Sequence, residues 1–247
     1  MSRTLFGLRV SPWTERARWA LDHHKLAYDY HEHVPMIGEV LLRRKARTSK
    51  ASVPLLSDGD DVVMGSLEIA KHAERTHGGA PLFPNDNAGE IERWADLAER
   101  ITKVGRDRLL CRMVASPKAQ AESLPSFIPG GLRGALAPTA GMALRFLARK
   151  YGSGSDLEAA EKRADETIRP LLEETREAIK DGGYVLSKDC FTFADIALAS
   201  SLQVLRPRME MTLGPATREA WTNEKLADEF EDLVAWRDTV YAKHRSS

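Results

Sequence analysis

Leu5-Phe6-Gly7-Leu8-Arg9-Val10-Ser11-Pro12-Trp13-Thr14 is the stretch that decides the fold of this chain. Its first six residues form an apolar run that predicts a short strand. Ser11 and Pro12 have the order of a helix start, a capping residue followed by proline at the first helical position. The following helix is predicted to be amphipathic, with an apolar face that carries Trp13, Ala17, Ala20 and Leu21. The stretch is a strand, a tight turn and a helix.

Strand and helix signals continue to alternate up to about residue 80. They predict a strand at 28–31, a β-hairpin with arms at 53–56 and 62–64, and a helix at 66–76 that stops at Gly78-Gly79. A basic segment, 43–47, lies between the second strand and the hairpin. The order is βαβ followed by ββα.

A stretch with glycine and proline, 78–84, separates this region from one in which every strong pattern is helical. We therefore predict an α/β domain at 1–80 and an all-α bundle at 88–247, joined by a linker at 81–87. The expected helices start near Ile91 and cover 140–151, 157–179, 193–205 and 226–241. Between the first two, segment 116–134 is broken by Pro117, Pro125, Pro129 and two glycines, so we expect a functional lid or a disordered loop.

Composition limits the classes of partner. Of 247 residues, 36 are Lys or Arg and 36 are Asp or Glu, so no net field attracts nucleic acid or an anionic membrane, although a local patch stays open. The sequence has no run of 18 apolar residues and no signal peptide, so we expect a cytoplasmic protein without an integral membrane segment. Cys111 and Cys190 form no pairing or metal motif, and we expect two buried thiols in a reducing compartment.

Residues 191–196, Phe-Thr-Phe-Ala-Asp-Ile, have the form of a capping box. Asp195 is placed to accept from the N–H of Thr192, and Phe191 to pack on Ile196. A catalytic carboxylate is the alternative, but capping explains all four residues together.

These features, in this order, resemble the cytosolic glutathione S-transferase (GST) superfamily. The resemblance rests on the Ser-Pro-Trp-Thr window at 11–14, Val53-Pro54, Gly65-Ser66, Leu82-Phe83-Pro84 and the capping box. It implies a thioredoxin-like N-terminal domain, an all-α C-terminal bundle and a homodimer. It also implies that glutathione is the co-substrate and that its thiolate attacks a small hydrophobic electrophile.

The window 11–14 holds hydroxyls where redox-active thioredoxin-like proteins have cysteines, so dithiol exchange is excluded there. The family uses such a hydroxyl to donate to the glutathione thiolate. Ser11 matches the position that some classes use and Thr14 the position that others use. We favour Ser11, because a serine that caps a helix as acceptor can still donate its proton, and we retain Thr14 as the alternative.

The resemblance also assigns residues to the glutathione peptide. Val53 precedes an implied cis-Pro54 and pairs with the cysteinyl backbone, while Ser66 at a helix N-terminus binds the γ-glutamyl carboxylate. Trp13 lies in the same window, and Lys50 is the candidate for the glycyl carboxylate. Gly65 departs from the family, which has Glu or Gln there.

Two alternatives complete the expectations. His23, His24, His31 and His33 lack the spacing of a zinc site, so we expect surface histidines and no metal. Gly65 and the 116–134 segment also fit a non-catalytic ligand-binding or scaffold protein with this fold.

Overall fold

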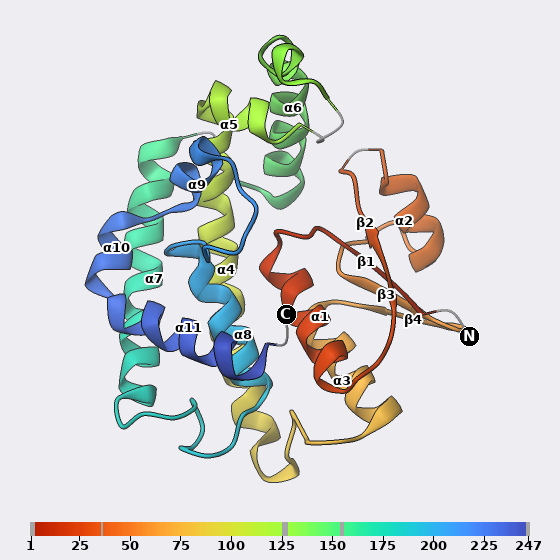
Figure 1. Ribbon diagram of the computed structural model, residues 1–247, viewed down its shortest axis with the longest axis vertical. Helices are drawn as coiled ribbons and strands as arrows, with labels where there is room; N and C mark the ends of the chain where they lie inside the picture. The colour runs from red at the N-terminus through yellow and green to blue at the C-terminus, as the bar shows by residue number, and fades with distance from the viewer. Residues whose placement is uncertain (1–2, 36, 125–127, 154–155, 246–247) are drawn as a thin grey trace. The chain divides into compact units, whose positions relative to one another are not determined.

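The computed structural model describes residues 3–35, 37–124, 128–153 and 156–245. The chain divides into two compact units. Unit 1 comprises Met1–Glu99, Thr175–Ser201 and Ala235–Ser247; unit 2 comprises Arg100–Glu174 and Leu202–Val234. Figure 1 shows the order of the elements along the chain.

Unit 1 is built on a four-stranded sheet of β1 (Arg3–Gly7), β2 (Asp29–Glu32), β3 (Leu55–Asp58) and β4 (Asp61–Met64). The strand order is β2-β1-β3-β4, with β1 parallel to β2 and the other neighbours antiparallel. The expected strand 5–10 is too long, because the N–H of Ser11 donates to the carbonyl of Leu8 and turns the chain after β1. This is the thioredoxin-like arrangement that the sequence predicts.

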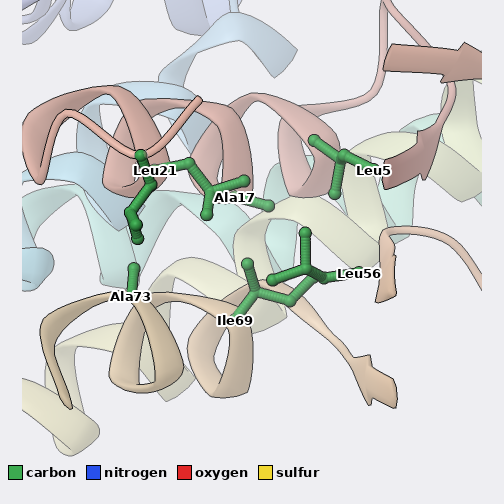
Figure 2. Packing of buried hydrophobic residues seen from close by; sticks show 7 residues of the cluster. Leu5, Ala17, Leu21, Leu56, Ile69 and Ala73 are labelled. Atoms are coloured by element: carbon green, nitrogen blue, oxygen red, sulfur yellow. The ribbon is translucent and has the colours of Figure 1, made fainter. Parts of the chain in front are cut away.

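Helices cover both faces of this sheet. Figure 1 shows α1 (Pro12–His23) and α3 (Ser66–His77) on one face and α2 (Glu39–Ala46) on the other. The α1/α3 face is packed by a cluster that Figure 2 shows around Leu5, Ala17, Leu21, Leu56, Ile69 and Ala73. Phe6 and Leu55 pack on the α2 side instead. Neighbouring residues of one strand thus serve opposite faces, as strand geometry requires.

After α3, the regular elements among the described residues are all helical, as predicted. The elements are η1 (Asn85–Asn87), α4 (Ala88–Ala115), α5 (Pro117–Glu122), α6 (Gly130–Tyr151), α7 (Leu157–Ile179), α8 (Phe193–Ser201), η2 (Leu202–Val204), α9 (Pro215–Trp221), α10 (Glu224–Glu229) and α11 (Glu231–His244). The bounds of α7 are those predicted. The expected helix 226–241 is interrupted at Phe230, and 193–205 gives way to a 3-10 turn after Ser201. Every helix of the described ranges is too short or too polar to cross a membrane.

Two parts of segment 116–134, residues 117–122 and 130–134, are helical. Pro117 occupies the first turn of α5, whose cap Ser116 accepts from the N–H of Ala119, and Gly130 opens α6. Pro125 lies outside the described residues. Proline is favoured at the first position of a helix, so the disordered-loop prediction was wrong for 117–122 and 130–134, while the functional lid stays a prediction.

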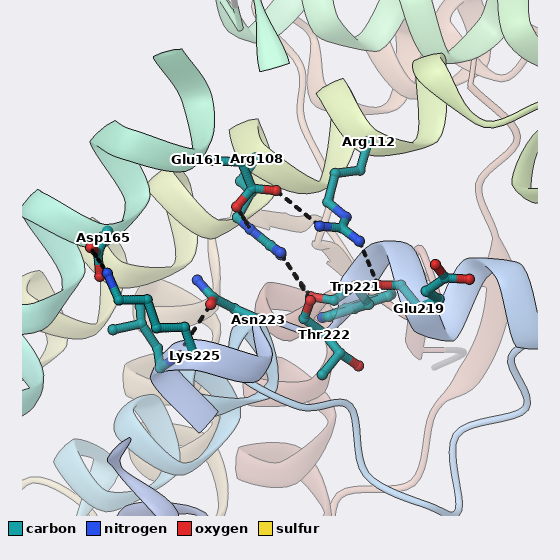
Figure 3. A network of polar contacts seen from close by, with 10 residues as sticks. Arg108, Arg112, Glu161, Asp165, Glu219, Trp221, Thr222, Asn223 and Lys225 are labelled. Carbon is teal, nitrogen blue, oxygen red and sulfur yellow. Dashed lines mark hydrogen bonds and ion pairs between the residues drawn. The ribbon is translucent and has the colours of Figure 1, made fainter. Parts of the chain in front are cut away.

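Unit 2 contains a buried polar network, shown in Figure 3. Arg108 of α4 donates to Glu161 of α7 at 2.6 Å and to the carbonyls of Trp221 and Thr222 at 3.1 and 2.9 Å. Arg112 binds the other oxygen of Glu161. These carbonyls lie at the C-terminus of α9, where helix carbonyls lack partners, so the guanidinium satisfies them and ties three helices together.

The expected hydrogen bond from the Thr192 N–H to Asp195 forms at the start of α8, together with further contacts that the pattern did not predict. Asp195 accepts from the N–H of Thr192 at 2.8 Å and also from its hydroxyl at 3.0 Å. Its second oxygen accepts from the N–H of Val185. Phe191 stacks on His244, with ring centroids 3.9 Å apart. Both carboxylate oxygens of buried Asp195 therefore accept hydrogen bonds that hold the start of α8.

The end of α11 completes unit 1 by contacting α1. The indole of Trp19 donates to the carbonyl of His244 at 3.1 Å. Arg245 binds Glu15 at 2.9 Å and Asp22 at 2.6 Å, both on α1. Residues more than 220 positions apart in sequence thus hold the same helix.

Candidate functional site

Three segments that carry candidate residues meet at one end of neighbouring strands β1, β3 and β4, which we call the β1/β3/β4 edge. The register pairs Phe6 with Leu55 and Leu55 with Met64. The end of β1, which leads to Ser11, therefore lies beside the start of β3 and the end of β4. Pro54 and Gly65 are the residues next to these paired positions, and the N–H of Gly65 donates to the carbonyl of Pro54 at 3.0 Å.

Ser11 occupies the N-cap position of α1, as predicted. Its backbone is extended, with φ −76° and ψ 128°, and Pro12 follows at the first helical position. Its side chain makes no capping hydrogen bond to the helix, although its backbone carbonyl accepts from Glu15. The half-exposed hydroxyl is thus not committed to the helix, which the sequence alone could not show.

Thr14 is fully buried and turned toward the protein. Its hydroxyl oxygen accepts from the N–H of Leu8 at 3.1 Å. Its side chain packs so tightly on Gly7 that a Cβ added there would approach the Thr14 methyl to 2.4 Å. Thr14 therefore fixes the turn between β1 and α1, and only a glycine fits opposite it.

A buried charge lies within the first turns of α1. Arg16 is 2% exposed and donates to Ser200 at 2.8 Å and to the carbonyl of Ala98 at 3.3 Å. Glu99 binds both Arg16, at 3.3 Å, and the indole N–H of Trp13, at 2.5 Å. Burial lowers the pKa of Arg16 to about 10, and Glu99 opposes that shift. The amphipathic pattern of this helix places Arg16 on the polar face, which is wrong, because the partners that bury Arg16 lie 82 or more residues away in sequence.

The Val53–Pro54 peptide bond is cis, as the family resemblance implied. Val53 is half-buried against the α2 side of the sheet. The backbone hydrogen bonds between described residues leave its N–H and carbonyl unused. These two groups are suited to pair with an extended peptide.

Gly65 and Ser66 form the start of α3. Gly65 has φ +89° and ψ 143°, a conformation that favours glycine, and a Cβ there would meet open space. Ser66 is buried and is the first residue of α3, which matches the predicted start of the helix at 66–76. The N–H groups of this first turn are the usual partners of a carboxylate.

Lys50 is the candidate residue with the least structural support for a role at this site. It is exposed, and its backbone N–H donates to the hydroxyl of Thr48. The register does not bring it to the sheet edge as it brings Pro54 and Gly65.

The expectation of surface histidines was wrong for His24 and His33. His24 is buried, with Nδ1 2.7 Å from the carbonyl of Gly78, and burial lowers its pKa. His33 is buried 3.4 Å from Glu39. Within the described residues, no group of three or more His, Cys, Asp or Glu side chains is arranged to hold a metal ion.

The two cysteines are free, and only one matches its expectation of burial. Cys111 is buried, which raises its pKa, whereas Cys190 is half-exposed.

Comparison with known proteins identifies relatives of this arrangement. Residues 5–81 match the family model for the glutathione S-transferase N-terminal domain. A glutathione S-transferase from Ceriporiopsis subvermispora in complex with glutathione is 14% identical, with a TM-score of 0.66 over 100% of this chain and 99% of that one. One from Methylobacterium radiotolerans in complex with glutathione sulfonate is 18% identical, with a TM-score of 0.62 over 98% and 92%. A glutathione transferase homolog from Drosophila mojavensis with bound glutathione is 18% identical, with a TM-score of 0.60 over 99% and 91%. No curated protein matched the chain.

Proposed function

The chain has a glutathione S-transferase N-terminal domain and the fold of the glutathione S-transferase superfamily, and we propose that it binds glutathione at the β1/β3/β4 edge and activates its thiol. The observation that carries this proposal is the hydroxyl of Ser11. It stands at the N-terminus of α1 with no capping bond, whereas the hydroxyl of Thr14 is buried and serves the loop.

The energies required are available from these groups. Lowering a thiol pKa from about 8.5 by two units requires about 2.7 kcal/mol in favour of the anion. A hydrogen bond to a charged group supplies about 1.5–3 kcal/mol, and a helix N-terminus about 0.3–1 kcal/mol. One donated hydrogen bond from Ser11 together with the α1 N-terminus is therefore sufficient.

In the proposal, the parts of glutathione other than its thiol bind further protein groups at or near this edge. In the proposal, the backbone of Val53 pairs with the cysteinyl residue. Ser66 and the first N–H groups of α3 bind the γ-glutamyl carboxylate. Trp13, held by Glu99, forms a wall beside the sulfur, and exposed Lys50, which the strand register does not bring to this edge, extends toward it to neutralise the glycyl carboxylate.

The proposed reaction is a transfer. The thiolate sulfur forms a bond to an electrophilic carbon of a small hydrophobic substrate, and the electron pair of the broken bond departs with the leaving group. Isomerisation, peroxide reduction and dehalogenation use the same thiolate. The homodimer implied by the family resemblance and the cytoplasmic location expected from the sequence belong to this proposal.

A non-catalytic ligand-binding or scaffold protein is the second candidate, favoured by one observation. Gly65 offers no side chain where the family has Glu or Gln, and the space beside it is open. One contact to the peptide is therefore missing, and affinity for glutathione is expected to be lower.

Titration with glutathione near pH 7 tests the proposal, with ultraviolet difference absorbance reporting the thiolate and calorimetry reporting binding. We expect a saturable thiolate signal that Ser11→Ala abolishes and Thr14→Ser retains. Binding heat without the signal would support the non-catalytic candidate. Absence of both in the folded protein would refute the glutathione site.

A further inference from the structure

The outer face of α2 combines exposed apolar residues with clustered cations. Ile37 is 82% exposed and Val40 76%, and Leu41 is also exposed. Arg43, Arg44, Lys45 and Arg47 follow and are all exposed. We call these seven residues the α2 face.

The α2 helix has its two sides clearly separated. Glu39 and Leu42 are buried toward the sheet. At about 100° per residue, Val40 and Leu41 lie on either side of the outward Arg44, while Arg43 and Lys45 lie at the edges. Long cationic side chains at the edges of an apolar face can extend to an interface while that face is buried.

The apolar residues of this face are not needed for the packing of unit 1. Ile37 and Leu41 border a hollow of about 220 Å³ that is mainly apolar and is also lined by Phe6 and Leu42. The sheet side of α2 is already packed by Leu42 with Phe6 and Leu55. Ile37 and Val40 are therefore exposed apolar side chains that a binding partner could bury.

Most cations of the α2 face form no ion pair with a carboxylate of the described residues. Arg43 approaches Glu39 at 4.0 Å. Among the described residues, no carboxylate forms an ion pair with Arg44, Lys45 or Arg47. Glu39 itself is buried against His33, and Glu32, beside the hollow, binds Arg9. The whole chain has equal numbers of acidic and basic residues, so this positive charge is a local concentration.

We propose that the α2 face is a docking surface for an anionic lipid membrane. Exposed Ile37 and Val40 insert at the level of the headgroups, while the four cations bind lipid phosphate and carboxylate groups. Exposed aliphatic side chains favour a lipid over a nucleic acid, whose sites join cations to aromatic stacking surfaces. The proposal does not rest on the transferase activity.

Co-sedimentation of the full chain with vesicles tests this surface. The probes are vesicles of phosphatidylcholine alone and vesicles with about 30 mol% phosphatidylserine, at low salt and at about 0.5 M NaCl. We expect binding only to the anionic vesicles, reversed by salt. Replacing Arg43, Arg44 and Lys45 with Gln should weaken it roughly a hundredfold, at about fivefold for each cation.

Two further variants make the result specific. Ile37→Ser with Val40→Ser should weaken vesicle binding roughly tenfold or more while all cations remain. A control with three exposed cations removed elsewhere, Arg75→Gln, Lys118→Gln and Arg149→Gln, should bind like the unchanged protein.

Four results would overturn the proposal. They are no binding to anionic vesicles, equal loss in the control variant, binding only to an oligonucleotide, and a smaller oligomer on substitution of Ile37 and Val40. The last would show that a second copy covers the face. Far-ultraviolet circular dichroism of each variant shows that it is folded.

Discussion

The indole N–H of Trp13 donates to the carboxylate of Glu99 over 2.5 Å, a link between residues 86 positions apart. The same carboxylate oxygen accepts from buried Arg16. One acidic side chain on α4 therefore holds the ring proposed to lie beside the thiolate and also contacts the buried arginine.

Glu99→Gln should lower the free energy of unfolding by about 2 kcal/mol, because the buried Arg16 charge loses its counter-charge. Partial exposure of Glu99 keeps the loss below that of a fully buried pair. Urea unfolding measures it. Glu166→Gln, which removes the exposed partner of Lys162, should change stability by less than about 0.5 kcal/mol. Equal midpoints for both variants would contradict the role of Glu99.

Thr14→Val should destabilise the protein by about 1–3 kcal/mol, because the N–H of Leu8 loses its acceptor in a partly buried position. Thr14→Ser keeps the hydroxyl and loses only the methyl packed on Gly7, at about 1 kcal/mol. Thermal unfolding compares the two. The thiolate absorbance of bound glutathione should be the same in both folded variants; its loss in Thr14→Val alone would make Thr14 the thiolate donor.

Asp195 should make stability depend on pH. Burial raises its pKa from 3.8 to about 6, although its hydrogen bonds from Thr192 and Val185 oppose this. Because the folded pKa lies above the unfolded one, the associated stability is complete below about pH 4 and is lost as the pH rises through about 6.

Asp195→Asn cannot titrate and leaves one N–H of the capping box facing an amide N–H₂ group, so it should be less stable than the unchanged protein at acidic pH. The difference in unfolding free energy should shrink by roughly 3 kcal/mol between pH 4 and pH 7. Urea unfolding at several pH values measures this difference. A constant difference over that range would show that Asp195 does not titrate there.

Arg245→Gln should lower the free energy of unfolding by about 1–2 kcal/mol and Tm by roughly 3–6 °C, because half-buried Glu15 and the more exposed Asp22, both on α1, lose their contacts with a half-buried arginine. Arg206→Gln is the matched control: it also removes an arginine that binds two carboxylates, but both are exposed. Scanning calorimetry should show little change for that control. A similar loss in both variants would remove the special role of the C-terminal segment.

Local sequence patterns predicted most helices and strands, whereas the surroundings of the candidate site residues depend on contacts between residues far apart in sequence. The helix 157–179 and the Thr192–Asp195 bond follow from spacing within one element, and both are confirmed. The free hydroxyl of Ser11 depends on side-chain geometry, and the burial of His24 depends on Gly78, more than 50 residues away. A glycine-and-proline count also could not distinguish a loop at 116–134 from two helix starts.

The discontinuous composition of unit 1 bears on how the protein is synthesised. When the first 99 residues have left the ribosome, Arg16 still lacks Ser200, and Trp19 lacks Tyr241 and the carbonyl of His244. The nascent sheet must therefore carry α1 with part of its packing surface unprotected until segment 235–245 has emerged. Chaperone demand should accordingly centre on the earliest helix of the chain, whose folding is finished by some of the latest residues.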